Sequence, residues 1–264
     1  MNYDSIYHAV ILIGGIGLLI GLFLGIAAIV FKVNVNEKEQ IILDILPGNN
    51  CGACGFPGCA NLAAAIANGE AAVNSCPVGG SACAKKIAEV MGTEASEMER
   101  NVAFVKCGGD CEKTKNKFDY YGIKECNMAN MVSGGIKSCE YGCLGYGSCV
   151  DVCEFDAMKI VNGIAVVDKE ACTACGKCVK VCPRNIIEMI PYKAIQVVKC
   201  VSKDKGPVVR KNCDVGCIAC GICVKNCAYD AIKVTDFCAK IDYSKCVNCG
   251  VCVEKCPQGI IIEN

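Results

Sequence analysis

The sequence has no tryptophan and a single histidine, and aromatic residues make up only 6% of its 264 residues. A chain with so few large side chains has limited means of building an ordinary hydrophobic core. Acidic and basic residues balance to a formal net charge of zero, so no excess of basic charge points to a nucleic-acid partner. The sequence has 27 cysteines instead, and these are the obvious candidates for holding the chain together.

Three kinds of chemistry account for a high cysteine content: disulfides, zinc sites and iron–sulfur clusters. Disulfides are the weaker explanation, because the number is odd and many cysteines stand in C-x2-C-x2-C runs, too close together to pair easily. Zinc usually takes two C-x2-C pairs, often with histidine. A C-x2-C-x2-C-x3-C run is the ligand pattern of two-cluster bacterial ferredoxins. We therefore expect [4Fe–4S] clusters, which imply a reducing compartment.

An uncharged segment near the N-terminus predicts a membrane anchor. Residues 9–31 carry no charge, and as a helix they would extend about 35 Å, enough for a hydrocarbon core of ~30 Å. The preceding residues lack the positive charge of a signal peptide. Lys32 and Lys38 follow the segment and weakly favour a cytoplasmic C-terminal part. We expect residues 1–33 to be a single-pass anchor in the cell membrane, with the remaining domains on the cytoplasmic side.

A first iron–sulfur domain is predicted over residues 34–100. Four of its cysteines have the spacing C-x2-C-x4-C-x16-C-P: Cys51, Cys54, Cys59 and Cys76. The glycines among them let the backbone wrap closely around a cluster. The alanine-rich residues 60–67 are expected to be helical and to carry the chain towards the fourth ligand. Cys83 lies outside the pattern and is expected to be a buried thiol.

The second half of the chain is an internal duplication with a period of 74 residues. Nine cysteines recur without a gap: Cys126, Cys139, Cys143, Cys149, Cys153, Cys172, Cys175, Cys178 and Cys182 match Cys200, Cys213, Cys217, Cys223, Cys227, Cys246, Cys249, Cys252 and Cys256. We interpret residues 101–190, with a cysteine-rich lead-in, and residues 191–264 as two ferredoxin-like 2[4Fe–4S] modules with short strands. The predicted fold class is α+β: one transmembrane helix, a small helical cluster domain and two tandem ferredoxin-like modules.

Two-cluster ferredoxins exchange the fourth cysteine of each run between their clusters. In the second copy this rule predicts one set made of Cys217, Cys220, Cys223 and Cys256. The other predicted set is Cys246, Cys249, Cys252 and Cys227.

The first copy departs from the pattern because Tyr146 stands where the second copy has Cys220. One complete set remains, made of Cys153, Cys172, Cys175 and Cys178. The other retains only Cys143, Cys149 and Cys182. Cys139, four residues before Cys143, could supply the missing thiolate; the alternative is a three-ligand or [3Fe–4S] site.

Three cysteines of the lead-in suggest a further cluster: Cys107, Cys111 and Cys126. Its fourth ligand could be Cys139, Cys200 or Cys213, which competes with the role of Cys139 above. Cys238 aligns with Ile164 of the first copy, so it is expected in the core. The sequence thus predicts at least five [4Fe–4S] clusters, and a sixth if the lead-in binds one.

The order of these motifs resembles the B subunit of the Rnf complex. An N-terminal span is followed by C-x2-C-x4-C-x16-CP and by ferredoxin modules, and the stretches CGACGFPGCANLA and KSCEYGCLGYGSCVDVC are similar to the long clostridial form. The resemblance implies ferredoxin:NAD⁺ oxidoreduction coupled to Na⁺ or H⁺ transport. It further implies that this subunit takes electrons from soluble reduced ferredoxin and passes them to the other subunits of a hetero-oligomeric membrane complex.

No motif for binding NAD⁺ or flavin is found, since no Rossmann glycine fingerprint follows a strand. No catalytic residues are therefore expected on this chain alone, and His8 precedes the apolar segment. Two other functions stay open: a ferredoxin-like subunit of another membrane enzyme, such as a hydrogenase or reductase, and a membrane-tethered redox sensor.

The segment from Lys180 to Lys211 is basic, with eight lysines and arginines and two acids. The family's soluble ferredoxins are typically acidic, so this segment could steer the electron donor to the chain. The alternative is a solvated linker whose charges only keep it soluble.

Overall fold

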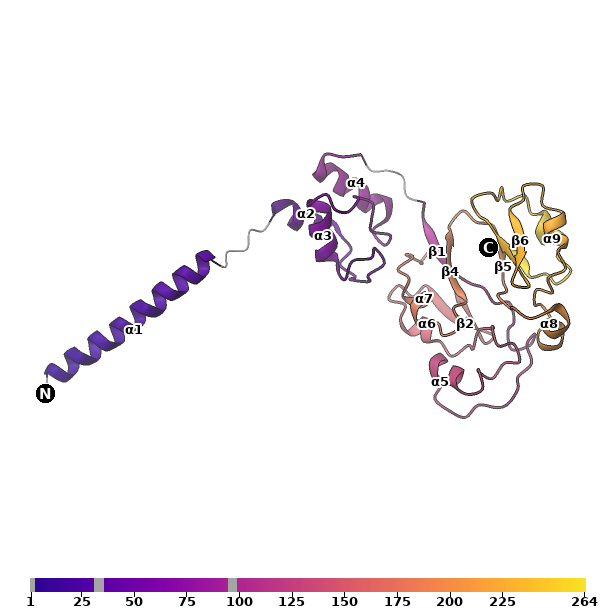
Figure 1. Ribbon diagram of the computed structural model, residues 1–264, viewed down its shortest axis with the longest axis horizontal. Coiled ribbons are helices and arrows are strands. Elements are labelled where there is room, and N and C mark those ends of the chain that lie inside the picture. Colours follow the sequence, from indigo (N-terminus) through magenta and orange to yellow (C-terminus); the bar gives the residue numbers. More distant parts are fainter. Residues whose placement is uncertain (1–2, 31–35, 95–98) are drawn as a thin grey trace.

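The computed structural model describes residues 3–30, 36–94 and 99–264 (Figure 1). Its first element is α1 (Tyr3–Val30), a single helix of 28 residues whose large apolar side chains, including Leu18 and Phe23, are exposed. A search of the described residues finds no helix with the length and apolarity needed to cross a membrane. The expected anchor at residues 1–33 therefore stays a prediction, and its first two and last three residues lie outside the described ranges.

Three helices form the N-terminal cluster domain: α2 (Glu37–Ile45), α3 (Cys59–Ala67) and α4 (Gly80–Met91). The predicted alanine-rich helix is confirmed as α3. Asn36 is the N-cap of α2, and its side chain accepts a hydrogen bond from the Lys38 amide at 3.1 Å, which satisfies one free donor. The helices pack around a small core of Ile42, Leu62, Ile66 and Ile87.

The first ferredoxin-like module contains two antiparallel strand pairs. β1 (Asn101–Val105) pairs with β4 (Ile187–Pro191), and β2 (Met158–Val161) pairs with β3 (Ile164–Val167). Asn162 and Gly163 both have positive φ, as a two-residue hairpin turn requires. The short helices are α5 (Cys126–Met131), α6 (Ser148–Asp151) and α7 (Lys177–Val181).

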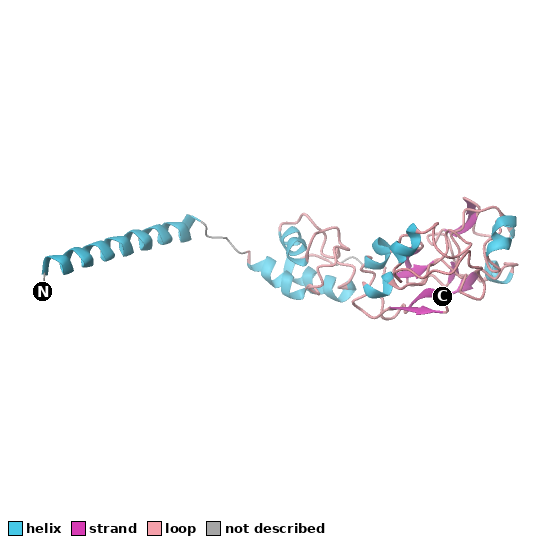
Figure 2. Cartoon of the chain, turned by 90° about the horizontal axis from the view of Figure 1, so that it is seen from below, coloured by secondary structure: helices cyan, strands magenta, loops and turns pink. Residues whose placement is uncertain are grey.

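The second module repeats this plan. β5 (Gln196–Val198) pairs with β8 (Ile261–Glu263), and β6 (Ile232–Thr235) pairs with β7 (Cys238–Ile241). Its helices are α8 (Gly206–Asn212), α9 (Ile222–Lys225) and α10 (Val251–Glu254). The strands of both modules lie in the C-terminal part of the chain, and the N-terminal part has only helices and loops among the described residues (Figure 2).

The strand pairing corrects one match of the 74-residue alignment. Each module opens with a strand that pairs with its own last strand, and each opening strand is followed after one residue by a cysteine, in FVKC and VVKC. Cys107 is therefore the counterpart of Cys200, whereas the alignment had predicted Cys126. The basic segment is also more than a linker, because it contains β4, β5 and most of α8. The domain boundaries themselves stay a prediction.

Candidate cluster-binding sites

Five cavities in the described part of the chain are each lined by four cysteines, and each encloses about 310 to 440 Å³ of space that is partly open to solvent. All 27 cysteines are described, and all have free thiols. Most other lining residues are apolar or glycine. The similar size and the common set of four sulfurs indicate that these cavities hold one kind of group.

The two cavities of the second module contain the residues that the sequence grouped. One, here called the Cys217 site, is lined by Cys217, Cys220, Cys223 and Cys256. The other, the Cys227 site, is lined by Cys227, Cys246, Cys249 and Cys252. The exchange of Cys227 and Cys256 between the runs follows from the chain's pseudo-symmetric path, in which each fourth cysteine leaves its own run and enters the neighbouring cavity.

The first module has one cavity with the expected residues. This Cys153 site is lined by Cys153, Cys172, Cys175 and Cys178. Burial raises the pKa of Cys178 to about 12, and the nearby thiols Cys172 and Cys175 add to the effect by charge repulsion. The backbone amide of Ala103 on β1 donates to the Cys172 sulfur at 3.3 Å. The opening strand of the module thus supplies a hydrogen bond to a candidate ligand.

The other cavity of the first module differs from the expectation. Cys143, Cys149 and Cys182 line it as predicted, but the fourth cysteine is Cys126 in place of Cys139. This is the Cys126 site. Burial raises the pKa of Cys149 to about 12, and charge repulsion from the other three thiols adds to this rise. The four sulfurs therefore surround a common space.

A local contact explains how Cys126 reaches this cavity. Cys126 is the first residue of α5, and its backbone amide donates to the Ser148 hydroxyl at 3.0 Å. Ser148 directly precedes Cys149, so this bond holds the start of α5 beside the cavity. The Tyr146 ring, which stands where the second copy has Cys220, packs against Tyr120 with ring centroids 5.7 Å apart. A cysteine from the lead-in therefore replaces the one that the run lacks.

Cys139 lies in a fifth cavity, between the lead-in and the second module. This interface site is lined by Cys107, Cys139, Cys200 and Cys213. The pKa of Cys139 is raised by burial, with Cys200 and Cys213 adding repulsion. Two contacts join the lead-in to the second module beside this cavity: the Gly108 amide donates to the Lys199 carbonyl at 2.9 Å, and Thr114 forms a β-bridge with Cys213.

The structure does not bring Cys107, Cys111 and Cys126 together as the sequence had suggested. Cys107 lines the interface site and Cys126 lines the Cys126 site, while Cys111 is exposed and lines none of the five cavities. The three residues considered as a fourth ligand, Cys139, Cys200 and Cys213, all lie in one cavity with Cys107. Sequence reasoning missed this set, although the repeated VKC after each opening strand was its signal.

The N-terminal set forms around the start of α3. The Asn50 side chain accepts a hydrogen bond from the Cys59 amide at 2.8 Å, and this bond holds the loop of Cys51 beside the helix. The Gly79 amide donates to the Cys76 sulfur at 3.3 Å. Burial raises the pKa of Cys76, and the thiols of Cys54 and Cys59 add to it, so these three sulfurs lie close together.

The N-terminal set also lies near the first module. Burial raises the pKa of Cys175, and among the nearby thiols Cys51 has the largest effect on it. Cys51 is therefore close to the Cys153 site.

The donor set fits [4Fe–4S] clusters better than single ions. No three His, Cys, Asp or Glu side chains of the described residues converge enough to hold one metal ion. In a [4Fe–4S] cluster each of four thiolates binds a different iron, so the sulfurs surround a group instead of meeting at a point. Backbone amides already point at several of the sulfurs, which is the kind of bond that stabilises a bound, negatively charged cluster.

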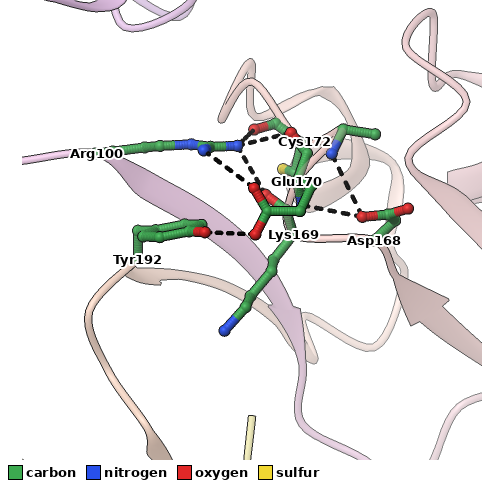
Figure 3. A network of polar contacts seen from close by, with 7 residues as sticks. Arg100, Asp168, Lys169, Glu170, Cys172 and Tyr192 are labelled. Atoms are coloured by element: carbon green, nitrogen blue, oxygen red, sulfur yellow. Dashed lines mark hydrogen bonds and ion pairs between the residues drawn. The ribbon is translucent and has the colours of Figure 1, made fainter.

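A polar network holds the loop that carries Cys172 (Figure 3). The Arg100 guanidinium donates to the carbonyls of Lys169 at 2.8 Å and Glu170 at 2.7 Å, and it reaches the Cys172 carbonyl at 3.4 Å. The same group lies 4.4 Å from the ring centroid of Tyr192, whose hydroxyl donates to Glu170. Arg100 thus joins the residue before β1 to the loop of a candidate ligand.

Repeated four-cysteine cavities in ferredoxin-like modules define an iron–sulfur electron-transfer protein. In agreement, the family model described as "Putative Fe-S cluster" matches residues 46–78, and the "4Fe-4S binding domain" model matches residues 165–188 and 239–262.

Comparison with curated proteins identifies the family. The chain is 49% identical to the B subunit of the Na⁺-translocating ferredoxin:NAD⁺ oxidoreductase complex of Acetobacterium woodii, over 92% of this chain and 73% of the relative. It is 42% identical to the B subunit of the ion-translocating oxidoreductase complex of Methanosarcina acetivorans, over 96% and 97%. It is also 42% identical to the B subunit of the proton-translocating ferredoxin:NAD⁺ oxidoreductase complex of Clostridium ljungdahlii, over 87% and 81%. The chain belongs to this family of B subunits of ion-translocating oxidoreductase complexes, which confirms the resemblance.

Proposed function

We propose that this chain is the iron–sulfur electron-transfer subunit of a membrane-bound ferredoxin:NAD⁺ oxidoreductase that pumps Na⁺ or H⁺. It accepts electrons from reduced soluble ferredoxin and relays them to partner subunits. The observation that carries this proposal is the series of four-cysteine sites running from the N-terminal domain through both modules. The family relatives, which are named as subunits of such complexes, supply the identity of the larger reaction.

Six sets of four cysteines account for 24 of the 27 thiols, leaving Cys83, Cys111 and Cys238. The proposed ligand sets are the N-terminal set (Cys51, Cys54, Cys59 and Cys76), the Cys126 site, the Cys153 site, the interface site, the Cys217 site and the Cys227 site. Each would hold one [4Fe–4S] cluster, or about 24 irons per chain. When bound, such clusters take up and release single electrons without proton chemistry by side chains.

The protein's own groups set how readily each site accepts an electron. The amides of Cys143 and Cys217 donate to the sulfurs of Cys107 and Cys200, each at 3.4 Å. Such hydrogen bonds stabilise added negative charge, and the apolar walls keep water away from it. The chain therefore supplies spacing and electrostatics, whereas the reduction of NAD⁺ is left to a partner subunit.

The membrane anchor is part of the proposal. The exposed apolar side chains of α1 support it, because a helix that is apolar on all faces needs an apolar surrounding. Lys32 and Lys38 favour a cytoplasmic location for the cluster domains, where soluble ferredoxin is available.

The test is anaerobic purification of the full chain from its native membrane through a C-terminal affinity tag. We expect flavoprotein and multi-span membrane subunits to co-purify, and we expect reduced ferredoxin to bleach the visible absorbance of the complex. Addition of NAD⁺ should then restore that absorbance. Co-purification with a hydrogenase or another reductase would contradict the proposal and favour the alternative enzyme. Isolation of the chain alone, with a single labile cluster, would favour the redox sensor.

A further inference from the structure

Lys137 is the only buried lysine or arginine in the part of the chain that the structure describes, with 3% of its surface exposed. Its backbone is held by the lead-in, because Lys137 forms a β-bridge with Asn116 and the Ser138 amide donates to the Lys115 carbonyl at 2.7 Å. The side chain therefore starts from a fixed point and extends into the protein instead of into solvent.

The Lys137 ammonium group is held by backbone carbonyls and not by an acid. It donates to the Gly109 carbonyl at 2.9 Å and to the Gly163 carbonyl at 3.1 Å. Among the described residues, no ion pair includes Lys137. Asp110, which directly follows Gly109, pairs with Lys113 at 2.8 Å. Buried charges are normally paired with an opposite charge, so the carboxylates of this chain leave that partner of Lys137 unfilled.

Gly109 lies between Lys137 and the interface site. It lines that cavity together with the four cysteines of the site. The Cys107 sulfur lies 3.9 Å from the same Gly109 oxygen that accepts the Lys137 hydrogen bond. A Cβ atom added at Gly109 would lie 3.1 Å from the Cys213 sulfur, so this residue also packs directly against the opposite side of the site. A single glycine thus separates the ammonium group from two candidate ligand sulfurs.

Two other lysines line the interface cavity itself, Lys106 and Lys199. Both are partly exposed, and the Lys106 ammonium group pairs with Glu188 at 2.6 Å. Water and an opposite charge weaken their electrostatic effect on the cavity. The charge of Lys137 has neither kind of screening.

The second copy has a lysine at the equivalent position, but its surroundings differ. Lys137 stands two residues before Cys139, and Lys211 stands two residues before Cys213. Lys211 is exposed in the last turn of α8. The interface site, which takes two cysteines from each copy, therefore has a buried positive charge on its first-module side alone.

We propose that Lys137 is a positioning residue whose buried charge raises the electron affinity of the interface site. The proposal rests on the function proposed above, in which the four sulfurs of this site bind a [4Fe–4S] cluster. Four thiolates give such a cluster a net negative charge, and this charge grows when the cluster is reduced. A fixed positive charge behind Gly109 stabilises the reduced form more than the oxidised form, and its burial keeps screening by water small.

The experiment removes the charge in two ways. Lys137→Met gives a neutral side chain of similar length, and Lys137→Gln gives a neutral side chain that keeps a hydrogen-bond donor. Lys211→Met is the matched control, because it removes one positive charge at the equivalent but exposed position. Each full-length chain is prepared anaerobically, its iron is counted, and its clusters are titrated by EPR at controlled potentials. The signal of the interface site is the one that Cys139→Ser lacks.

We expect Lys137→Met and Lys137→Gln to keep their iron and to lower the electron affinity of the interface site roughly tenfold. For a one-electron couple this is a shift of about 59 mV to more negative potential. Lys211→Met should stay near the wild-type value, because water screens an exposed charge.

Four results would overturn the role of the Lys137 charge. An unchanged potential in both neutral variants would show that the charge has no effect on the site. A shift in Lys137→Met alone would assign the effect to the hydrogen bonds, and an equal shift in Lys211→Met would assign it to overall charge. Loss of about four irons in both neutral variants would show that Lys137 only holds the fold of the site. A wild-type chain without iron would instead refute the underlying function, which the iron count shows separately.

Discussion

Cys107 and Cys200 occupy equivalent positions in the two modules and line the same cavity. Each follows the opening strand of its module, and each sulfur accepts a backbone amide at 3.4 Å, from Cys143 and Cys217 respectively. Cys139 and Cys213 are a second such pair, since each stands four residues before the cysteine that donates that amide. The interface site thus takes two cysteines from each copy, and an approximate two-fold relation between the modules builds it.

The ligand sets can be separated by two single substitutions. We expect Cys126→Ser and Cys139→Ser each to lower the iron content from about 24 to about 20 per chain, but to remove different EPR signals, because the two sulfurs lie in different cavities. Cys139→Ser should lose the same EPR signal as Cys213→Ser, and Cys126→Ser should lose the same EPR signal as Cys149→Ser. If Cys126→Ser and Cys139→Ser lost the same signal, the separation of the Cys126 site and the interface site would be wrong. Cys111→Ser, at an exposed cysteine outside the five cavities, is the control and should keep all its iron.

Removal of iron should unfold the cluster domains. The buried cores are small and consist largely of cysteine, alanine and valine or isoleucine, so metal–ligand energy replaces much of an ordinary core. We expect a chelator with an oxidant to abolish the far-ultraviolet circular dichroism of residues 45–264, while the chelator alone under anaerobic conditions leaves it unchanged. Retention of the native spectrum by the iron-free chain would show that the protein core suffices.

Arg100 should stabilise the Cys153 site through the loop of Cys172. Replacing it by alanine removes two short hydrogen bonds to carbonyls and the contact with the Tyr192 ring. Because the side chain is nearly half exposed, we expect a loss of about 1 kcal/mol in the free energy of unfolding. We also expect faster loss of iron from this site under a chelator. Arg100→Lys should recover only part, since a lysine cannot reproduce the planar fork. Lys169→Ala leaves the Arg100 contacts in place but removes the Lys169 bond to the Asn264 carbonyl, so it should cost less than Arg100→Ala and should not speed the loss of iron. An equal effect there would argue against this role.

The basic segment supplies a test of the donor's docking site. Lys203, Lys205 and Lys211 are exposed, whereas Lys199 lines the interface site and Arg184 is half-buried with a hydrogen bond to the Gly134 carbonyl. Reversing the three exposed lysines to glutamate should slow electron uptake from an acidic ferredoxin at low ionic strength. The defect should shrink as salt shortens the Debye length towards ~3 Å.

A matched control reverses three other exposed lysines of the two modules, Lys159, Lys225 and Lys255, which changes the net charge equally at different positions. Stopped-flow measurement of both variants with intact clusters separates local docking from overall charge. Equal slowing of electron uptake in the two variants would show that overall charge is the cause. No slowing in the first variant would indicate that ferredoxin docks elsewhere, most directly at the N-terminal domain.

Much of this protein could be predicted from local spacing. The Cys153 site and both second-module sites come from runs in which cysteines a few residues apart face one space. The alanine-rich α3 follows from intrinsic helix propensity. The grouping of the four N-terminal cysteines stays a prediction. The hairpin turn at Asn162 and Gly163 also depends on local sequence, because the two central residues determine the turn type.

The two remaining sites depend on contacts between segments far apart in the chain. The gapless 74-residue register made Cys126 the apparent partner of Cys200. The true counterpart is Cys107, because Cys107 and Cys200 each follow the opening strand of their module, and these two cysteines are 93 residues apart. The lead-in is an insertion between β1 and the first cysteine run of its module. An alignment that matches the cysteine runs without a gap therefore gives the wrong partner to a cysteine that precedes this insertion. The sequence by itself thus predicted the class of protein, the kind of ligand and the cysteines of three of the five cavities. Only the tertiary structure decided which distant cysteines complete the Cys126 site and the interface site, because strand pairing and the bond from Cys126 to Ser148 bring those sulfurs together.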